Sequence, residues 1–223
     1  MLSVVIPTLN AAATLEATVG SVRVEAPQAE MIVADAGSAD GTPSLAEQLG
    51  ARIVPGPRSR GEQLIRGARA ARGDWLLFLH ADTTLAPGWM AAAQTFMTKS
   101  GVLARAAAFR FALDDPAPSA RRLECLVAWR CRMFGLPYGD QGLLIGRAFY
   151  DSLGGFKSLA LMEDVDLVRR IGKRRLVLLD VAAVTSAERF RRDGYVRRSA
   201  RNLACLGLYV LGVPTRFIAR VYG

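Results

Sequence analysis

The feature that most constrains the fold of this chain is an alternation, in its first hundred residues, of short apolar runs with longer segments of helical pattern. The apolar runs cover residues 2–7, 31–34, 52–54 and 75–79, and the helical patterns cover 11–25, 43–49, 62–72 and 87–98. This rhythm predicts βαβ units and an α/β fold whose mostly parallel central sheet is flanked by helices. Ligands of such sheets bind beyond the carboxyl ends of the strands.

The second half of the chain predicts a different arrangement. Residues 106–113 and 143–146 are strand candidates, and residues 119–134 form a helical pattern that mixes arginines with apolar side chains. A further short helix is expected over 147–153, before a Gly-Gly stop. We therefore expect a mixed sheet edge and a lobe for a second substrate.

Length and charge limit the class of protein. A chain of 223 residues that is 51% hydrophobic can build one α/β core and is short for two. Its net charge of +9 favours an anionic partner, and nucleotide phosphates, nucleic acid and the acidic face of a membrane all fit this description. The three cysteines form no Cys-x-x-Cys pair, so we expect reduced thiols and a cytoplasmic protein. The amino terminus lacks the pattern of a signal peptide and opens with a strand.

The carboxyl-terminal residues predict two amphipathic helices separated at Pro214. Apolar side chains recur there at helical spacing, with arginines on the other faces. Two interpretations stay open: both helices pack on the sheet with solvated arginines, or they form a basic surface that contacts an anionic membrane. The apolar stretch 203–213 has about half of the roughly 20 residues that a transmembrane helix needs.

His80-Ala81-Asp82 follows the apolar run 75–79, where a buried strand would emerge into a loop. Mg²⁺ and Mn²⁺ take carboxylate oxygens and bridge the two phosphates of a nucleotide leaving group, so Asp82 is a candidate metal ligand. His80 is then a second ligand or a supporting group. The alternative is that Asp82 only caps the turn before Pro87.

Two loops could meet the rest of a nucleotide. Small residues surround Asp35 and Asp40, which allows a close backbone approach while a carboxylate accepts from a base or ribose hydroxyl. An ordinary Asp/Gly turn explains this segment equally well. Arg58, Arg60 and Arg66 flank Gly61 and could meet a diphosphate, or Arg58 and Arg60 could belong to a solvated basic face.

Glu163-Asp164 opens a predicted helix near residue 163. Asp166 has Arg169 and Arg170 at helical spacing as ion-pair partners, which explains Asp166 without a function. Glu163 and Asp164 have no basic residue three or four positions further on. We therefore assign Asp164 as a general base and Glu163 as the group that orients it.

Several of these segments occur together in one order. They are Pro7-Thr8-Leu9-Asn10, Asp35 with Asp40-Gly41-Thr42, Gly61 with Arg66, Leu79-His80-Ala81-Asp82, Gly139-Asp140-Gln141-Gly142, Gly154-Gly155-Phe156 and Glu163-Asp164. As a set they resemble glycosyltransferase family 2. The closer resemblance is to a small bacterial branch labelled as associated with radical-SAM or selenoprotein domains.

The resemblance implies a GT-A fold and transfer of a sugar from a nucleotide-diphospho-sugar to an acceptor hydroxyl, usually with inversion. It implies a glycosyltransferase domain over 1–192, with a nucleotide-binding half at 1–98 and an acceptor half at 99–192. The helices of 193–223 would pack on the same domain. The Gln-x-x-Arg-Trp segment of processive members is absent, so we expect transfer of a single sugar.

The resemblance also implies roles for residues. Pro7, Asn10 and Asp35 would line the base and ribose, and Asp82 would be the metal-binding end of the Asp-x-Asp motif, with Mn²⁺ or Mg²⁺. Asp164 would deprotonate the acceptor. The remaining donor-site residues implied are Arg66, His80 and Ala81. This chain departs from the family pattern because His80 stands where the first aspartate usually lies.

Three alternatives remain at this point. A nucleotidyltransferase of related fold would also use a metal, but it normally has a glycine-rich basic signature near the first strand. An inactive sugar-nucleotide-binding protein is motivated by His80. A basic nucleic-acid-binding protein would explain the charge, but the sequence contains no recognised binding motif, so we expect no nucleic acid partner. The acceptor cannot be identified from the sequence, and a lipid-linked acceptor is one candidate.

Overall fold

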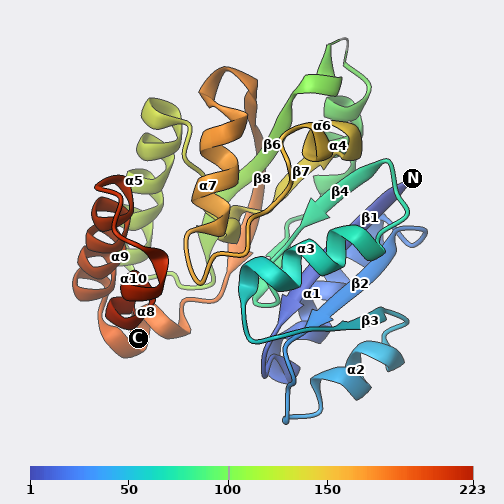
Figure 1. The fold of residues 1–223 in the computed structure, drawn as a ribbon, viewed down its shortest axis with the longest axis horizontal. Coiled ribbons are helices and arrows are strands. Elements are labelled where there is room, and N and C mark those ends of the chain that lie inside the picture. The colour runs from blue at the N-terminus through green and yellow to red at the C-terminus, as the bar shows by residue number, and fades with distance from the viewer. Residues whose placement is uncertain (100, 223) are drawn as a thin grey trace.

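The computed structural model describes residues 1–99 and 101–222, and its centre is one eight-stranded mixed sheet with helices on both faces (Figure 1). The strands are β1 (Leu2–Thr8), β2 (Glu30–Asp35), β3 (Arg52–Pro55), β4 (Trp75–Phe78), β5 (Thr83–Leu85), β6 (Ala106–Leu113), β7 (Leu143–Gly146) and β8 (Leu176–Thr185). The helices are α1 (Ala12–Glu25), α2 (Thr42–Gln48), α3 (Arg60–Ala70), α4 (Trp89–Met97), α5 (Pro118–Phe134), α6 (Arg147–Ser152), α7 (Glu163–Ile171), α8 (Glu188–Asp193), α9 (Tyr195–Val210) and α10 (Thr215–Tyr222). The strand order is β3-β2-β1-β4-β7-β6-β8-β5.

The sheet has a parallel half and a mixed half. Strands β1 to β4 pair in parallel, as the βαβ rhythm predicts. Strand β7 then runs antiparallel to both β4 and β6, while β8 pairs in parallel with β6 and antiparallel with β5. The mixed edge is therefore confirmed. Strands β5 and β8 were not predicted, because β5 has three residues and β8 leaves several side chains half-buried or exposed.

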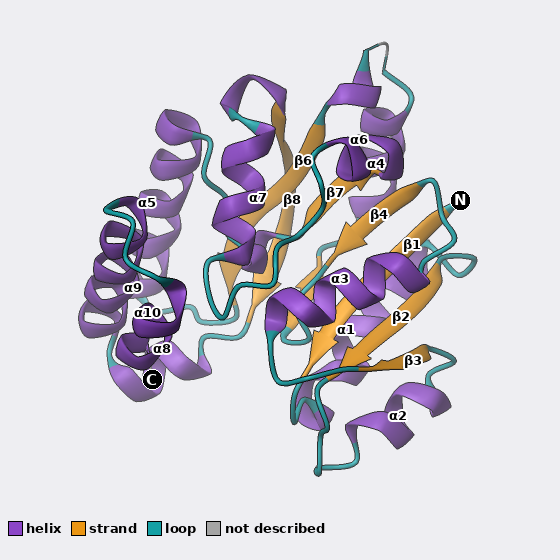
Figure 2. Cartoon of the chain, in the orientation of Figure 1, coloured by secondary structure: helices purple, strands orange, loops and turns teal. Residues whose placement is uncertain are grey.

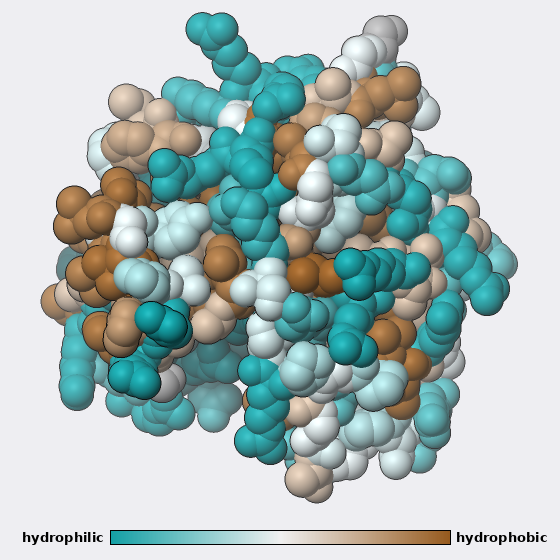
Figure 3. All heavy atoms as spheres, viewed as in Figure 1, coloured by the Kyte–Doolittle hydropathy of each residue, from teal (hydrophilic) through white to brown (hydrophobic). Residues whose placement is uncertain are grey.

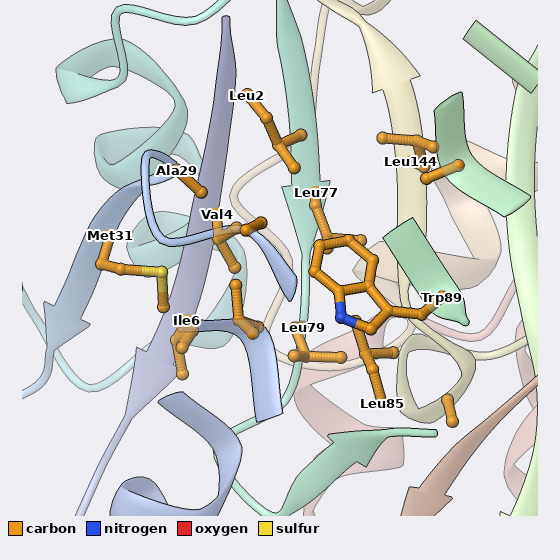
Figure 4. Packing of buried hydrophobic residues seen from close by; sticks show 14 of the residues in the cluster. Leu2, Val4, Ile6, Ala29, Met31, Leu77, Leu79, Leu85, Trp89 and Leu144 are labelled. Carbon is orange, nitrogen blue, oxygen red and sulfur yellow. The ribbon is translucent and has the colours of Figure 1, made fainter. Parts of the chain in front are cut away.

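Side chains of β1 point alternately to the two faces of the sheet, and the core is therefore divided into two layers. Val4 and Ile6 face the layer formed with α1, α2 and α4, whereas Val5 faces the layer formed with α3, α6 and α7. Figure 4 shows the first layer, in which the indole of Trp89 packs near Leu77 and Leu85. Full burial of each such side chain stabilises the fold by about 1.5–3 kcal/mol. The first layer also includes residues of β6, β7 and β8, so the two halves share one core.

Helix α3 approaches the sheet closely at a glycine. A Cβ atom on Gly67 would lie 2.3 Å from Cγ1 of Val5, so no larger residue fits without moving the helix. Nearer the start of α3, Nε2 of Gln63 donates to the carbonyl oxygens of Thr8 and Ala34, which holds that end of the helix next to the carboxyl ends of β1 and β2.

Four helices cover the end of the molecule furthest from β3 (Figure 2). Helix α5 packs on β6 through Val127 and Cys131, and Phe190 and Tyr195 contact the same cluster. Asp193 accepts hydrogen bonds from Arg198 and Arg201, which ties α8 to α9. None of the helices in the described part of the chain is both long and apolar enough to cross a bilayer.

Candidate active site

A cavity of about 480 Å³ opens at the carboxyl ends of β1 and β4. Pro7 and Asn10 line it from the end of β1, and His80, Ala81 and Asp82 line it from the end of β4. Parallel strands place their carboxyl ends at one edge of the sheet, and this edge is where α/β sheets bind ligands. The cavity thus gathers five of the residues that the sequence assigned to donor and metal binding.

Asp35 lies behind this cavity rather than on its wall. Its side chain is 5% exposed and accepts hydrogen bonds from Oγ1 of Thr8, Oγ of Ser38 and the backbone N–H groups of Gly37 and Ser38. Burial alone would raise the pKa of Asp35, but the hydrogen bonds outweigh it and hold the pKa below its usual value. Thr8 lines the cavity, so Asp35 supports the wall from the second layer of residues.

The loop after β2 is locked to the start of α1. The amide oxygen Oδ1 of Asn10 accepts from the backbone N–H of Ala39, and Asp40 accepts from the backbone N–H of Ala12. Asn10 has φ 53, a left-handed conformation that non-glycine residues adopt at a cost. Met162, directly before α7, shares this property with φ 68. Among the described non-glycine residues only these two have positive φ, and both border the candidate site.

A smaller cavity of about 100 Å³ adjoins the first and is lined by Glu163 and Asp164. Arg60, His80 and Asp140 line both cavities, so the two spaces meet at these side chains. The acids at the start of α7 thus lie beside the metal and donor candidates. Asp82 and Asp164, predicted as metal ligand and base, thus line adjoining cavities, whereas Asp35, predicted to converge with them, lines neither.

Gly139 forms the contact between these segments. A Cβ atom at position 139 would lie 2.5 Å from Nε2 of His80 and 3.3 Å from Oδ2 of Asp164. Its backbone N–H donates to that Oδ2 atom at 2.7 Å, and Oδ1 of Asp164 accepts from the N–H of Val165. Burial and the positive charge of Arg60 lower the pKa of His80 to about 4, so its imidazole is neutral at pH 7.

Glu163 and Asp140 are short of hydrogen-bond partners. Oε2 of Glu163 and Oδ1 of Asp140 are shielded from solvent and accept no hydrogen bond within the described chain. Burial raises the pKa of each carboxyl to about 7. The nearest cation to Glu163 is Arg60, whose Nε lies 3.7 Å from Oε1. Carboxylates kept in this state are common where a ligand or a proton completes the site.

Arg60 reaches Glu163 because two segments pack closely. A Cβ atom on Gly61 would lie 2.5 Å from the carbonyl oxygen of Lys157, so the chain before α7 can lie directly on the start of α3. Glu163 and Arg60 are far apart in sequence, and helical spacing alone gave no partner for Glu163. Asp166 instead pairs with Arg170, as expected, and also with Lys157.

Arg66 was predicted to belong to the donor site, but it lies outside both cavities. Helix α3 turns Gln63, Leu64 and Gly67 inward, which leaves Arg66 exposed, and it is not among the described residues lining either cavity. Arg58 and Arg60, for which a solvated face was the alternative, line the large cavity instead. Arg58 and Arg60, at and just before the start of α3, thus lie where the sequence predicted a diphosphate contact, and Arg66 does not.

Two sets of residues that line the cavities were not predicted from the sequence. Asp140 is one of them. It lies in the Gly-Asp-Gln-Gly segment, and a single acid between two glycines was the only sequence pattern that could have indicated its role. The tail was the other omission: Arg198, Asn202 and Tyr222 of α9 and α10 line the large cavity. Arg198 donates to the hydroxyl of Tyr222 at 3.0 Å, which joins these helices at the cavity wall. Nothing in the sequence indicated that these tail residues line the cavity, because the spacing of side chains in the tail indicates only amphipathic helices.

The acidic groups are suited to a hard divalent cation. Asp82 and Asp140 supply carboxylate oxygens to the same cavity, and Oδ1 of Asp140 lacks a partner. No three His, Cys, Asp or Glu side chains group closely enough to bind an ion alone within residues 1–99 and 101–222. A cation here would need further oxygen atoms, which the diphosphate of a nucleotide provides.

The fold and this cavity at the strand ends define an α/β domain of the GT-A type. Solved structures agree with the fold. Glucosyl-3-phosphoglycerate synthase from Mycobacterium tuberculosis, in a complex with Mn²⁺, UDP and glucosyl-3-phosphoglycerate, superposes with a TM-score of 0.64 at 22% identity over 96% of this chain and 81% of that one. The mannosyltransferase PcManGT from Pyrobaculum calidifontis, with GDP-Man and Mn²⁺, gives 0.67 at 19% identity over 92% and 60%.

The family model for glycosyl transferase family 2 matches residues 3–150, and the chain belongs to this family. A curated relative, the PGL/p-HBAD biosynthesis glycosyltransferase of Mycobacterium bovis, is 38% identical over 96 residues, which cover 38% of this chain and 36% of the relative. The match thus spans about a third of that relative. The family membership predicted from the order of the motifs is confirmed.

Proposed function

We propose that this protein transfers a single sugar from a nucleotide-diphospho-sugar to an acceptor hydroxyl, with inversion at the anomeric carbon. One observation carries the proposal: carboxylates from three distant segments, Asp82, Asp140 and Asp164, line adjoining cavities at the ligand-binding edge of the sheet. Family membership and the Mn²⁺ and nucleotide complexes of similarly folded proteins support it. Residues 1–98 would supply most of the donor site, and residues 99–192 the acceptor site.

The large cavity would hold the donor. Pro7, Asn10 and Ala81 form its wall where we place the base and ribose, and Asp35 keeps that wall rigid through Thr8. Arg58 and Arg60 would face the diphosphate, since guanidinium groups pair with phosphate oxygens in two-pronged contacts. The residues of 193–223 would close the donor site through Arg198.

Asp82 would hold the divalent cation, Mn²⁺ or Mg²⁺, with the neutral imidazole of His80 beside it. When bound, the cation neutralises the charge that develops on the departing diphosphate. Asp140 approaches the same space and would take the place of the acid that the motif lacks at position 80.

Asp164 would deprotonate the acceptor hydroxyl in the small cavity. The backbone N–H of Gly139 holds its Oδ2 atom and the N–H of Val165 holds Oδ1, so the carboxylate is fixed while each oxygen keeps a free lone pair. Glu163 would position the site by holding Arg60 between the two cavities. The attacking oxygen then displaces the diphosphate through an oxocarbenium-like state.

For the acceptor we propose a molecule with a lipid chain, and for the location the cytoplasmic side of a membrane, in peripheral contact with anionic lipid. The support is the basic tail: residues 195–222 contain five arginines and no acid. The donor sugar and base depend on loop shape and are left to experiment.

A thermal-shift screen of UDP-, GDP- and dTDP-sugars, with and without Mn²⁺, tests the proposal. We expect one donor class to raise the melting temperature, more so with Mn²⁺, because the cation and the donor share the site. In Asp82→Asn the Mn²⁺-dependent part should disappear and sugar transfer should fall about 10³-fold or more. Asp180→Asn, an exposed acid on β8, is the matched control. Unaltered Mn²⁺ dependence in Asp82→Asn would refute the metal assignment.

A further inference from the structure

Helix α5 is apolar on two opposite faces. One face packs on the sheet through Ala120, Val127 and Cys131. The other carries Leu126, Trp129 and Met133, spaced three and four residues apart, with 62%, 56% and 53% of their surfaces exposed. A helix on the surface of a soluble domain normally has polar side chains on its outer face.

The tail helices extend this surface. Of the fifteen large apolar side chains that the described residues expose, ten lie on α5, α9, α10 and the α9–α10 turn: Leu126, Trp129, Met133, Phe134, Val196, Leu203, Val210, Leu211, Phe217 and Val221. We call these ten residues the apolar end. Figure 3 shows hydrophobic surface gathered at the left, over the positions of α9 and α10 in Figure 1. Single exposed apolar residues are ordinary, but a concentration of them marks an interaction surface.

The exposed charged side chains on α5, α9 and α10 are all arginines, and the acid of α5, Glu124, is paired with Arg121. Arg197, Arg216 and Arg220 are exposed on α9 and α10, and Arg122 and Arg132 are exposed on α5. The tail from 195 to 222 has no acid at all. A second copy of this chain would bring its own arginines against these, which repel. An anionic bilayer matches both properties, because it offers acidic headgroups and an apolar interior.

We propose that the apolar end docks on an anionic membrane surface, with Trp129 and its neighbours inserted at the headgroup level and the arginines on the lipid phosphates. Tryptophan and arginine suit this position because each combines an apolar body with a polar tip. The docking surface includes α5, which lies outside the tail.

The same helices connect the docking surface to the site. Asn202 and Tyr222 line both cavities, whereas Leu203 and Val221, next to them in sequence, are exposed at the apolar end. Docking would thus hold the small cavity close to the bilayer, where a hydroxyl on a membrane-embedded chain could enter. The docking assigns a surface to the membrane contact proposed above, and this last step rests in addition on the proposed glycosyl transfer.

The fluorescence of Trp129 can report on docking to the membrane. The chain has three tryptophans, of which Trp89 is fully buried and Trp75 is partly buried in the same core. With phosphatidylglycerol vesicles at low salt we expect the 223-residue chain to co-sediment and the fluorescence emission to shift to the blue. Phosphatidylcholine vesicles should bind far less, and salt should weaken binding to the anionic vesicles.

Variants separate the two contributions. The double variant Trp129→Ser, Met133→Ser should weaken vesicle binding about tenfold or more through lost apolar insertion. Arg216→Gln with Arg220→Gln should weaken it by about fivefold for each arginine and reduce the salt dependence. Val24→Ser, at a side chain 82% exposed on α1 at a distance in sequence from the apolar end, is the control and should bind as the parent does.

Absence of sedimentation with phosphatidylglycerol vesicles at low salt would overturn the proposal. So would equal losses in the control and in the apolar-end variants. A dimer in sedimentation velocity without lipid that Trp129→Ser dissociates would assign the surface to a second copy instead. Donor-induced thermal shifts are measured without vesicles, so failure of docking and failure of the proposed glycosyl transfer give different results.

Discussion

The acids on the two sides of the cleft are held in opposite ways. In the loop after β2, Asp35 and Asp40 accept hydrogen bonds from nearby backbone and hydroxyl groups, and their pKa values lie below the usual range. Around the small cavity, Glu163 and Asp140 each keep an oxygen that is shielded from water and without a partner in the described chain, and burial raises their pKa to about 7.

This difference separates acids that build the site from acids left free to act in it. Saturated carboxylates stabilise a loop and have little capacity for a further ligand. Carboxylates short of partners cost stability, and that cost is recovered when a cation, a hydroxyl or a proton arrives. We therefore expect substitution of Asp35 or Asp40 to lower mainly stability, and substitution of the acids that line the two cavities to lower activity.

Among the substitutions that test this comparison, Asp164→Asn should have the largest effect. The amide keeps the shape of the side chain but cannot take a proton, so sugar transfer should fall about 10²–10⁴-fold. Donor binding, measured by thermal shift, should persist, and Asp151→Asn on α6 is the matched control. Transfer at the parental rate would remove Asp164 as the base and weaken the contrast between the two sides.

A smaller effect, on stability, should follow Asp35→Asn. The amide cannot accept all four hydrogen bonds, so we expect the free energy of unfolding in urea to fall by about 3–4 kcal/mol at pH 7. Because the folded pKa of Asp35 is lowered, its stabilisation is present above the unfolded value of 3.8 and is lost as the pH falls through the folded pKa. Parent and variant should therefore converge in acid; a constant difference between pH 7 and pH 2 would contradict this account.

The smallest effect concerns Glu163 and the pH dependence of stability. Its pKa rises from 4.5 to about 7 on folding, so the folded state binds more protons between these values and stability decreases as the pH rises through them. Glu163→Gln should remove about 2–3 kcal/mol of this decrease. The melting temperature from pH 5 to pH 8 is the measurement, with Glu16→Gln on α1 as the exposed control. Parallel profiles for parent and Glu163→Gln would show that Glu163 is solvated.

The fold was accessible from the sequence where elements are long and periodic. The four parallel strands and their helices were predicted to within about two residues at most ends. Strand β8 was missed because its pairing with β6, across a register shift between Phe109 and Arg110, gives it order that its own pattern does not indicate. Its position at the far side of β6 also decides where α8 and the tail begin.

The candidate site was accessible only in part. The positions of His80 and Asp82 could be predicted because the apolar run before them indicates a buried strand, and a loop begins where that run ends. Arg66 was predicted to contact the donor because it follows the loop before α3. In the structure the inward face of α3 carries Gln63 and Gly67, and Arg66 lies outside both cavities. Arg60 and Glu163 could not be paired from the sequence, because the close approach at Gly61 joins segments a hundred residues apart.

The sequence by itself determined the βαβ half, the family and the residues able to do chemistry, because strand periodicity, glycine turns and acids at strand ends are local properties. Only the tertiary structure decided which acids lack partners, that Asp140 joins them, and that the tail both lines the cleft and exposes an apolar surface. Burial and hydrogen-bond satisfaction depend on what the rest of the chain packs against each group, and one-dimensional spacing does not contain that information.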